Sequence, residues 1–119
     1  MTPLTEETCI RKNVDVRQLR GLQALLRQKT SLENLADLLT VAGSGTRLKI
    51  LFLLAQDSEL CVCDLADVTG TTVSAISHQL SKLRAHGLIG KRRAGQTIFY
   101  RLLDTPFAGF LRHLFELED

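Results

Sequence analysis

The chain has 119 residues, 45% of them hydrophobic and 24% charged, which is typical of a single globular domain and excludes a disordered chain. It contains neither an apolar run long enough to span a membrane nor the continuous apolar segment of a secretory signal, so we expect a cytoplasmic protein with no membrane partner. The net charge is only +2, but residues 68–103 contain six Lys or Arg and no Asp or Glu. This local charge of +6 is typical of a nucleic-acid binder, and charge alone leaves a solvated basic face without a ligand as an equal alternative.

The first half of the chain is predicted to be helical. We expect a flexible polar arm over residues 1–13, followed by a single domain over residues 14–119. Apolar residues then recur at helical spacing in three segments, which cover residues 15–29, 32–42 and 46–55. Thr46 is the expected N-cap of the third helix, after a break around Gly43 and Gly45. The apolar residues of this helix that we expect to be largely buried are Leu48, Leu51, Phe52, Leu54 and Ala55.

The second half is predicted to hold two close helices, a hairpin and a last helix. The segments concerned are residues 61–69, 73–86, 88–93, 97–102 and 106–117. Helix, short turn, helix and basic hairpin, in this order, predict a winged helix-turn-helix, so the expected fold class is mainly α with a β-hairpin wing. The two terminal helices carry more apolar residues than so short a domain can bury, so we expect them to pair in a two-fold homodimer.

The helix over residues 73–86 is the expected recognition helix. At about 100° per residue, Val73, Ile76, Leu80 and Leu83 fall on one arc that packs inward, and small hydroxyls fall on the adjoining arc. An ordinary amphipathic surface helix is the alternative, but serines are mildly unfavourable there, whereas at DNA they allow close approach and hydrogen bonds. The expected contacts to double-stranded operator DNA, including cations of the wing, are Thr72, Ser74, Ser77, His78, Ser81, Lys82, Lys91, Arg92 and Arg93.

Residues 59–65 (ELCVCDL) are the most chemically specific segment. Cys61 and Cys63 would point about 200° apart on an ideal helix, so one ion can bind both only where the start of the helix is irregular or unwinds. Such a distortion would reach the helix that supports the recognition helix. Cys9 in the arm is the natural third ligand, and three thiolates without histidine suit a soft ion such as Cd(II), Pb(II), Hg(II) or As(III).

Other functions of the cysteines stay open. Cys61 and Cys63 could sense oxidants or reactive sulfur by forming a disulfide, although a bridge between residues two apart is strained. A metal carrier that never binds DNA is a further alternative. A small thiol enzyme would need a nucleophile with its base, or a cofactor motif, and the sequence offers neither, so we expect no enzymatic activity and no organic cofactor.

Three motifs within residues 35–103 resemble those of the ArsR/SmtB family of metal-sensing repressors. Residues 45–51 (GTRLKIL) look like the family's signature before the helix-turn-helix, residues 59–65 like its metal box, and residues 76–83 (ISHQLSKL) like its recognition helix. The resemblance implies an ion-free dimer that binds an operator upstream of efflux or detoxification genes and dissociates when metal binds.

Within that family, the metal box and the position of Cys9 most resemble the cadmium- and lead-sensing branch. The resemblance implies that the N-terminal arm supplies a cysteine to the metal box of the other subunit, so the ligand set carries over to Cys9, Cys61 and Cys63. That branch has a second arm cysteine, and Asn13 stands near the equivalent place here. This departure shifts the expected site from four sulfurs to three.

Zinc-sensing relatives bind their ion through carboxylate and histidine ligands on the last helix. His113 and Glu116 keep part of that spacing, but Pro106 stands where a ligand histidine would follow Asp104. An isolated His and Glu on a helix face are usually solvated. We therefore expect no functional zinc site there.

Overall fold

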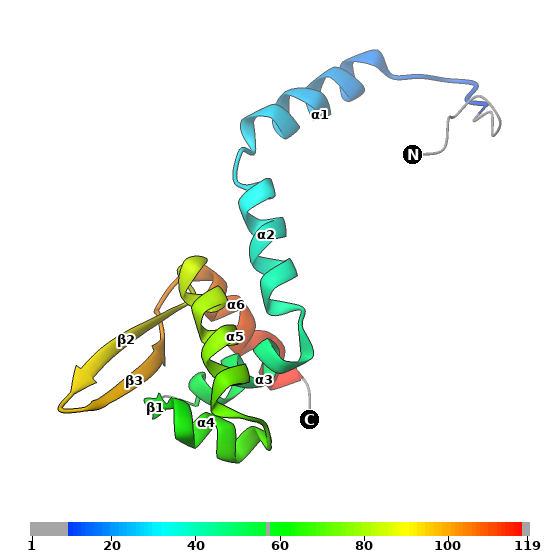
Figure 1. The fold of residues 1–119 in the computed structure, drawn as a ribbon. Helices are drawn as coiled ribbons and strands as arrows, with labels where there is room; N and C mark the ends of the chain where they lie inside the picture. The colour runs from blue at the N-terminus through cyan, green and yellow to red at the C-terminus, as the bar shows by residue number, and fades with distance from the viewer. Residues whose placement is uncertain (1–9, 57, 118–119) are drawn as a thin grey trace. The chain divides into compact units, whose positions relative to one another are not determined.

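The computed structural model describes residues 10–56 and 58–117, whose helices and strands are shown in Figure 1. The chain divides into two compact units, with the boundary between Glu33 and Asn34. The first unit contains α1 (Val16–Gln28), and the boundary falls in the first turn of α2 (Leu32–Ala42). The second unit continues with α3 (Gly45–Leu54), β1 (Leu60–Cys61), α4 (Val62–Thr69), α5 (Val73–Ala85), β2 (Ile89–Ala94), β3 (Thr97–Leu102) and α6 (Pro106–Leu117).

This order of elements confirms the predicted fold class, which is mainly helical with an antiparallel hairpin. The last helix has the bounds that the sequence predicted, and the other predicted helices agree to within a residue or two. In the described part of the chain, no helix is long and apolar enough to cross a membrane.

The first unit contains an amphipathic helix with no buried side chain. Asp15 is the N-cap of α1, and its carboxylate accepts a hydrogen bond from the Gln18 N–H at 3.1 Å, which satisfies one of the free donors at the start of the helix. Leu22, Leu25 and Leu26 are 53%, 61% and 65% exposed. An apolar stripe of this kind is stable in water only against a partner surface.

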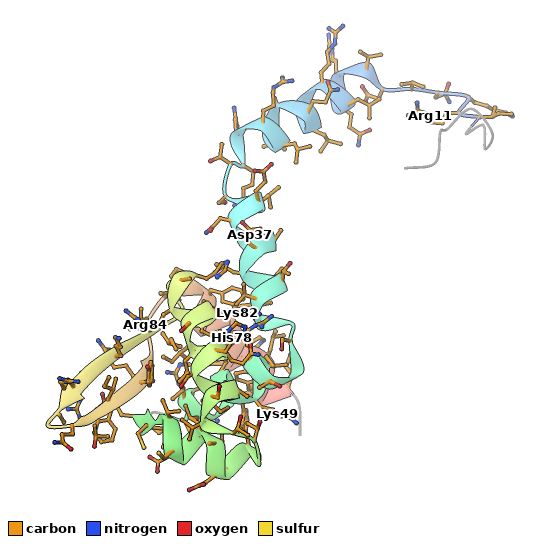
Figure 2. The ribbon with its side chains drawn as sticks, viewed as in Figure 1. Arg11, Asp37, Lys49, His78, Lys82 and Arg84 are labelled. Atoms are coloured by element: carbon orange, nitrogen blue, oxygen red, sulfur yellow. The ribbon has the colours of Figure 1, made fainter. Side chains whose placement is uncertain are left out.

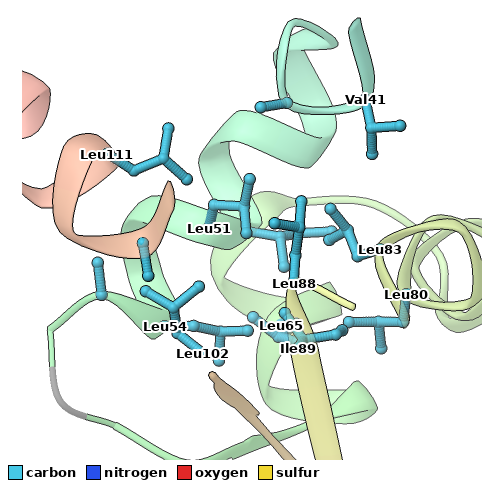
Figure 3. Close-up of a cluster of buried hydrophobic side chains, with 14 of the residues drawn as sticks. Val41, Leu51, Leu54, Leu65, Leu80, Leu83, Leu88, Ile89, Leu102 and Leu111 are labelled. Carbon is cyan, nitrogen blue, oxygen red and sulfur yellow. The ribbon is translucent and has the colours of Figure 1, made fainter. Parts of the chain in front are cut away.

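The second unit has one hydrophobic core, to which α3, α4, α5, the sheet and α6 all contribute (Figure 3). Its largest fully buried side chains are Ile50, Leu51, Leu54, Leu65, Ile76, Leu80, Leu83 and Leu88. Burial of one such side chain contributes about 1.5–3 kcal/mol. Because α5 supplies three of these residues, the same packing that stabilises the unit also fixes the helix expected to read DNA.

The start and the burial of α3 differ from the prediction. Ser44, and not Thr46, occupies the N-cap position, because the helix already begins at Gly45. Leu51 and Leu54 are buried as expected, but Leu48 is 39% exposed and Phe52 44% exposed. Both side chains line an apolar hollow of about 1000 Å³ that is also lined by α6. Helix α3 therefore has apolar side chains both on the face that packs into the core and on the face that lines this hollow.

The two helices of the helix-turn-helix are joined by a tight turn at Gly70. Its φ of +71° lies in the left-handed region, which glycine adopts without steric cost. Thr72 follows as the N-cap of α5, and its hydroxyl accepts a hydrogen bond from the Ala75 N–H at 3.1 Å. The turn and the cap together fix where α5 begins relative to α4.

The sheet has three antiparallel strands in the order β1-β3-β2 (Figure 1). The hairpin of β2 and β3 was predicted, but β1 was not, since the sequence placed Cys61 in the following helix. Cys61 instead pairs with Phe99 of β3, and Phe99 pairs on its other side with Arg92 of β2. The register therefore places a cysteine, an aromatic ring and a wing arginine in one row across the sheet.

Candidate DNA interface and thiol site

The exposed face of α5 carries the residues that the sequence predicted to contact DNA. Ser74, Ser77, His78, Ser81 and Lys82 are all exposed, and Figure 2 labels His78 and Lys82 on this helix. Hydroxyl, imidazole and ammonium groups of this kind donate to base edges and phosphate oxygens. The geometry therefore leaves this face free for a groove of DNA.

The opposite face of α5 is buried as predicted, except at its first residue. Ile76, Leu80 and Leu83 are at most 1% exposed, whereas Val73 is 47% exposed, so its predicted burial is wrong. Val73 is the first residue of the helix, and it lies beyond the edge of the core.

Two of the hydroxyls on this face also have partners within the helix. Thr72 accepts the capping bond described above, and the Ser81 hydroxyl donates to the Ser77 carbonyl at 3.1 Å. A hydroxyl has one donor and two acceptor positions, so each keeps free capacity for a second hydrogen bond. Thr72 thus has a structural role in addition to its predicted contact with DNA.

Arg47 connects the recognition helix to the preceding helices, which sequence reasoning missed. Its Nε donates to the Val41 carbonyl at 2.6 Å, and its Nη1 donates to Oε1 of Gln79 at 2.7 Å. Val41 lies at the end of α2, where carbonyls lack partners within the helix, and Gln79 lies beside His78 on α5. The motif at residues 45–51 contained Arg47, but its partner is 32 residues away, beyond any local pattern.

The three predicted wing cations, Lys91, Arg92 and Arg93, are exposed on β2. Arg92 is held in place by two contacts. Its Nε donates to both carboxylate oxygens of Glu59, at 3.0 and 2.8 Å, and its guanidinium lies over the Phe99 ring, 5.1 Å from the centroid. The hydrogen bond from Arg92 is the main cause that lowers the pKa of the Glu59 carboxyl, and the same bond raises the pKa of Arg92. Sequence reasoning did not single out Glu59.

The two thiols lie at the junction between β1 and α4. Cys61 is half-buried with an extended backbone at φ −84° and ψ 169°, and Cys63 is exposed in the first turn of the helix; both are free cysteines. The Asp64 carboxylate accepts a hydrogen bond from the Cys61 N–H at 3.3 Å. Because the helix begins only at Val62, the angle of about 200° expected on an ideal helix does not apply to this pair.

The junction supplies two soft sulfur ligands, which fit a thiophilic ion in donor type but not in number. Among residues 10–56 and 58–117, no three His, Cys, Asp or Glu side chains come together in a group that could hold a metal ion. The third predicted ligand, Cys9, lies outside the described residues. His113 and Glu116 are exposed on α6.

Comparisons with known proteins agree with this architecture. Residues 44–91 match the sequence pattern of the family described as bacterial regulatory protein, arsR family. The chain is 32% identical over 106 residues to a protein of Synechocystis sp. named transcriptional repressor SmtB homolog, covering 89% of this chain and 80% of that protein. It is also 32% identical over 71 residues to a cadmium resistance transcriptional regulatory protein, CadC homolog, of Staphylococcus aureus, covering 60% of this chain and 59% of that protein.

The fold is also similar to a solved structure. This is the solution structure of a homodimeric winged helix-turn-helix DNA-binding domain from Mycobacterium bovis, described as a possible ArsR-family transcriptional regulator. The TM-score is 0.65 at 28% sequence identity, and the match covers 90% of this chain and 89% of that chain.

Proposed function

Because this chain belongs to the ArsR/SmtB family of metal-sensing transcriptional repressors, we propose that its homodimer binds operator DNA in the ion-free state and releases it when a thiophilic ion binds Cys9, Cys61 and Cys63. The observation that carries this proposal is the position of the thiols. Cys61 lies in a strand that pairs with the wing, and Cys63 lies in the helix that leads to α5. A rearrangement at this junction would reach α5 along the chain through α4, and the wing through the pairing of β1 with β3.

The inducer that we propose is one of the soft ions Cd(II), Pb(II), Hg(II) or As(III). Three thiolates without a histidine ligand favour such ions over Zn(II), which in closed structural sites usually takes four ligands. The relative from Staphylococcus aureus is named for cadmium resistance, which supports a soft ion. The chain would contribute the three ligands, because the sulfurs of Cys9, Cys61 and Cys63 would bind the same ion.

A homodimer is proposed because two apolar helix faces are largely exposed among the described residues. The stripe of α1 is exposed, and on α6 the side chains of Phe110, Leu114 and Leu117 are 45%, 41% and 70% exposed. The structure from Mycobacterium bovis is of a homodimeric domain, which supports the same state here. Two copies present two recognition helices, as the reading of two half-sites requires.

In this dimer, α5 would read base edges in the major groove while β2 contacts phosphates. The proposed contacts on α5 are Thr72, Ser74, Ser77, His78, Ser81 and Lys82, and those on the wing are Lys91, Arg92 and Arg93. The hydroxyls and His78 would supply specificity, and the four cations would supply the salt-dependent part of the affinity.

The test is fluorescence anisotropy of the reduced protein on DNA from its own promoter, with anaerobic titration of each soft ion and of Zn(II). We expect release by at least one soft ion and little effect of Zn(II). Matched Cys9→Ser, Cys61→Ser and Cys63→Ser variants should bind DNA within about twofold of wild type and lose at least tenfold in their response to the ion.

Three outcomes would contradict this function. Loss of DNA binding in the serine variants themselves would make the cysteines structural. Release by oxidant alone, with a Cys61–Cys63 disulfide detected by mass spectrometry, would favour a redox or reactive-sulfur sensor. Failure to bind any promoter fragment at low salt would favour a metal carrier.

A further inference from the structure

A single row of side chains connects the thiol segment to the wing. Cys61 of β1, Phe99 of β3 and Arg92 of β2 are paired in register across the sheet. Directly paired residues of antiparallel strands place their side chains on the same face of the sheet. The guanidinium of Arg92 accordingly lies over the Phe99 ring, at 5.1 Å from its centroid. The wing arginine therefore rests on the residue that pairs with a predicted metal ligand.

Glu59 is the second residue that contacts this arginine. It precedes β1 directly, and its carboxylate accepts two hydrogen bonds from Nε of Arg92 at 3.0 and 2.8 Å. A guanidinium has five N–H groups, and these two bonds occupy only the one on Nε. The four N–H groups on Nη1 and Nη2 keep their capacity to bind a phosphate. Glu59 thus orients Arg92 without using the groups that would contact DNA.

We propose that Glu59 is a positioning residue through which the thiol segment controls the wing. In the ion-free protein it holds Arg92 in the orientation that contacts operator phosphate. When Cys61 and Cys63 bind one ion, Glu59 moves with β1 and the contact to Arg92 is lost. The second half of this inference rests on the proposed function, whereas the first half concerns the ion-free protein alone.

The junction is built so that a small change at the thiols reaches Glu59. β1 has only two residues paired with β3, Leu60 with Tyr100 and Cys61 with Phe99, so few hydrogen bonds hold it in place. An ion that draws both sulfurs and a third ligand to one centre would shift the backbone between Cys61 and Cys63, and Glu59 is two residues from Cys61. An exposed ion pair is a weak contact in water, so it breaks at little cost.

The test is a double-mutant cycle with Glu59→Gln and Arg92→Gln, read out as operator affinity with and without saturating Cd(II). The cycle cancels the general effect of removing a charge near DNA, and Asp67→Asn, which removes an exposed carboxylate from α4, is the matched control for Glu59→Gln. Both substituted side chains are partly exposed, so the variants should fold. We expect the two substitutions to be coupled by about fivefold in the ion-free protein and by less than about twofold in Cd(II).

Two results would overturn the inference. No coupling in the ion-free protein would mean that Glu59 does not position Arg92 for DNA. The same coupling with and without Cd(II), in a wild-type protein that Cd(II) releases, would mean that release takes another route and would leave the proposed function standing. If Cd(II) and the other soft ions do not release wild type, the proposed function is wrong, and the ion-free cycle alone still decides whether Glu59 positions Arg92.

Discussion

Arg47 is the side chain that joins three helices of the second unit. It is half-buried, and its two hydrogen bonds reach the end of α2 and the middle of α5. Hydrogen bonds from a charged donor contribute about 1.5–3 kcal/mol each when they are shielded from water, and removal of the donor leaves both acceptors unsatisfied. Since Gln79 is next to His78, the orientation of Arg47 bears on the residues that we propose to contact DNA.

We expect Arg47→Ala to lower the free energy of unfolding by about 2 kcal/mol and to weaken operator binding. Arg47→Lys should recover part of the stability but not both contacts, because a lysine lacks the rigid fork of donors. Chemical denaturation and anisotropy measure the two effects. Lys49→Ala, an exposed position on the same helix, is the control and should change stability by less than about 0.5 kcal/mol. Equal stability of the two alanine variants would show that the Arg47 contacts contribute nothing.

At the scale of single elements, the wing depends on the turn between β2 and β3. Gly95 has a φ of +65°, in the left-handed region, and among the described residues no atom beyond its two chain neighbours lies within 4 Å of the position where a side chain would begin. A side chain there would therefore meet no neighbour, and only the backbone conformation opposes it. A substitution at Gly95 therefore measures the free-energy cost of the left-handed backbone conformation without a contribution from a steric clash.

Gly95→Ala should lower the free energy of unfolding by about 1 kcal/mol, the usual cost of the left-handed conformation for an L-residue. Thermal unfolding of wild type and variant measures this loss of stability. Gly109→Ala is the matched control, because this glycine lies inside α6, has an ordinary helical φ and also has nothing within 4 Å. Alanine stabilises a helix interior by up to about 1 kcal/mol relative to glycine. A destabilisation of the same size at both positions would contradict the role given to the turn.

The local sequence predicted the long elements well and the short one not at all. The helix from Pro106 to Leu117 and the hairpin have patterns that repeat over several residues, and they are marked by Pro106 at the start of the helix and by Gly95 in the turn. β1 has two residues, and it exists because Leu60 and Cys61 pair with a strand far along the chain. No periodicity can show in two residues, so the segment was taken as the start of a helix.

The candidate site was predicted as a set of residues but not as a set of contacts. The exposed face of α5 and the cations of β2 follow from helical and strand spacing. The pairs Arg92 with Glu59 and Arg47 with Gln79 join residues 33 and 32 positions apart, so only the folded chain brings them together. The exposure of Phe52 could not be predicted either, because it depends on how helices distant in the sequence pack around α3.

At the scale of the whole molecule, the central expectation is the homodimer. A charge within the apolar stripe of α1 should prevent its burial against a partner surface, because an unpaired buried charge is costly. Leu25, which is 61% exposed, is the position to change.

We expect Leu25→Glu to be monomeric at micromolar concentration and to lose at least tenfold in operator affinity, as measured by sedimentation and anisotropy. Gln28→Glu adds the same charge at another exposed position of α1, outside the apolar stripe, and should remain dimeric. A dimeric Leu25→Glu with wild-type affinity would exclude the stripe of α1 from the interface.

The unequal exposure of the two thiols has a consequence for how fast the repressor responds. A soft ion bound by small-molecule thiols passes to the protein by exchange of one thiolate ligand for another, and this exchange requires access to the protein's thiolate. Cys63 is exposed and Cys61 is half-buried, so of these two thiols Cys63 would take the ion before Cys61. The exposure of Cys63 would then bear on how fast the site begins to fill, whereas the affinity of the completed site would set the ion concentration at which the operator is released.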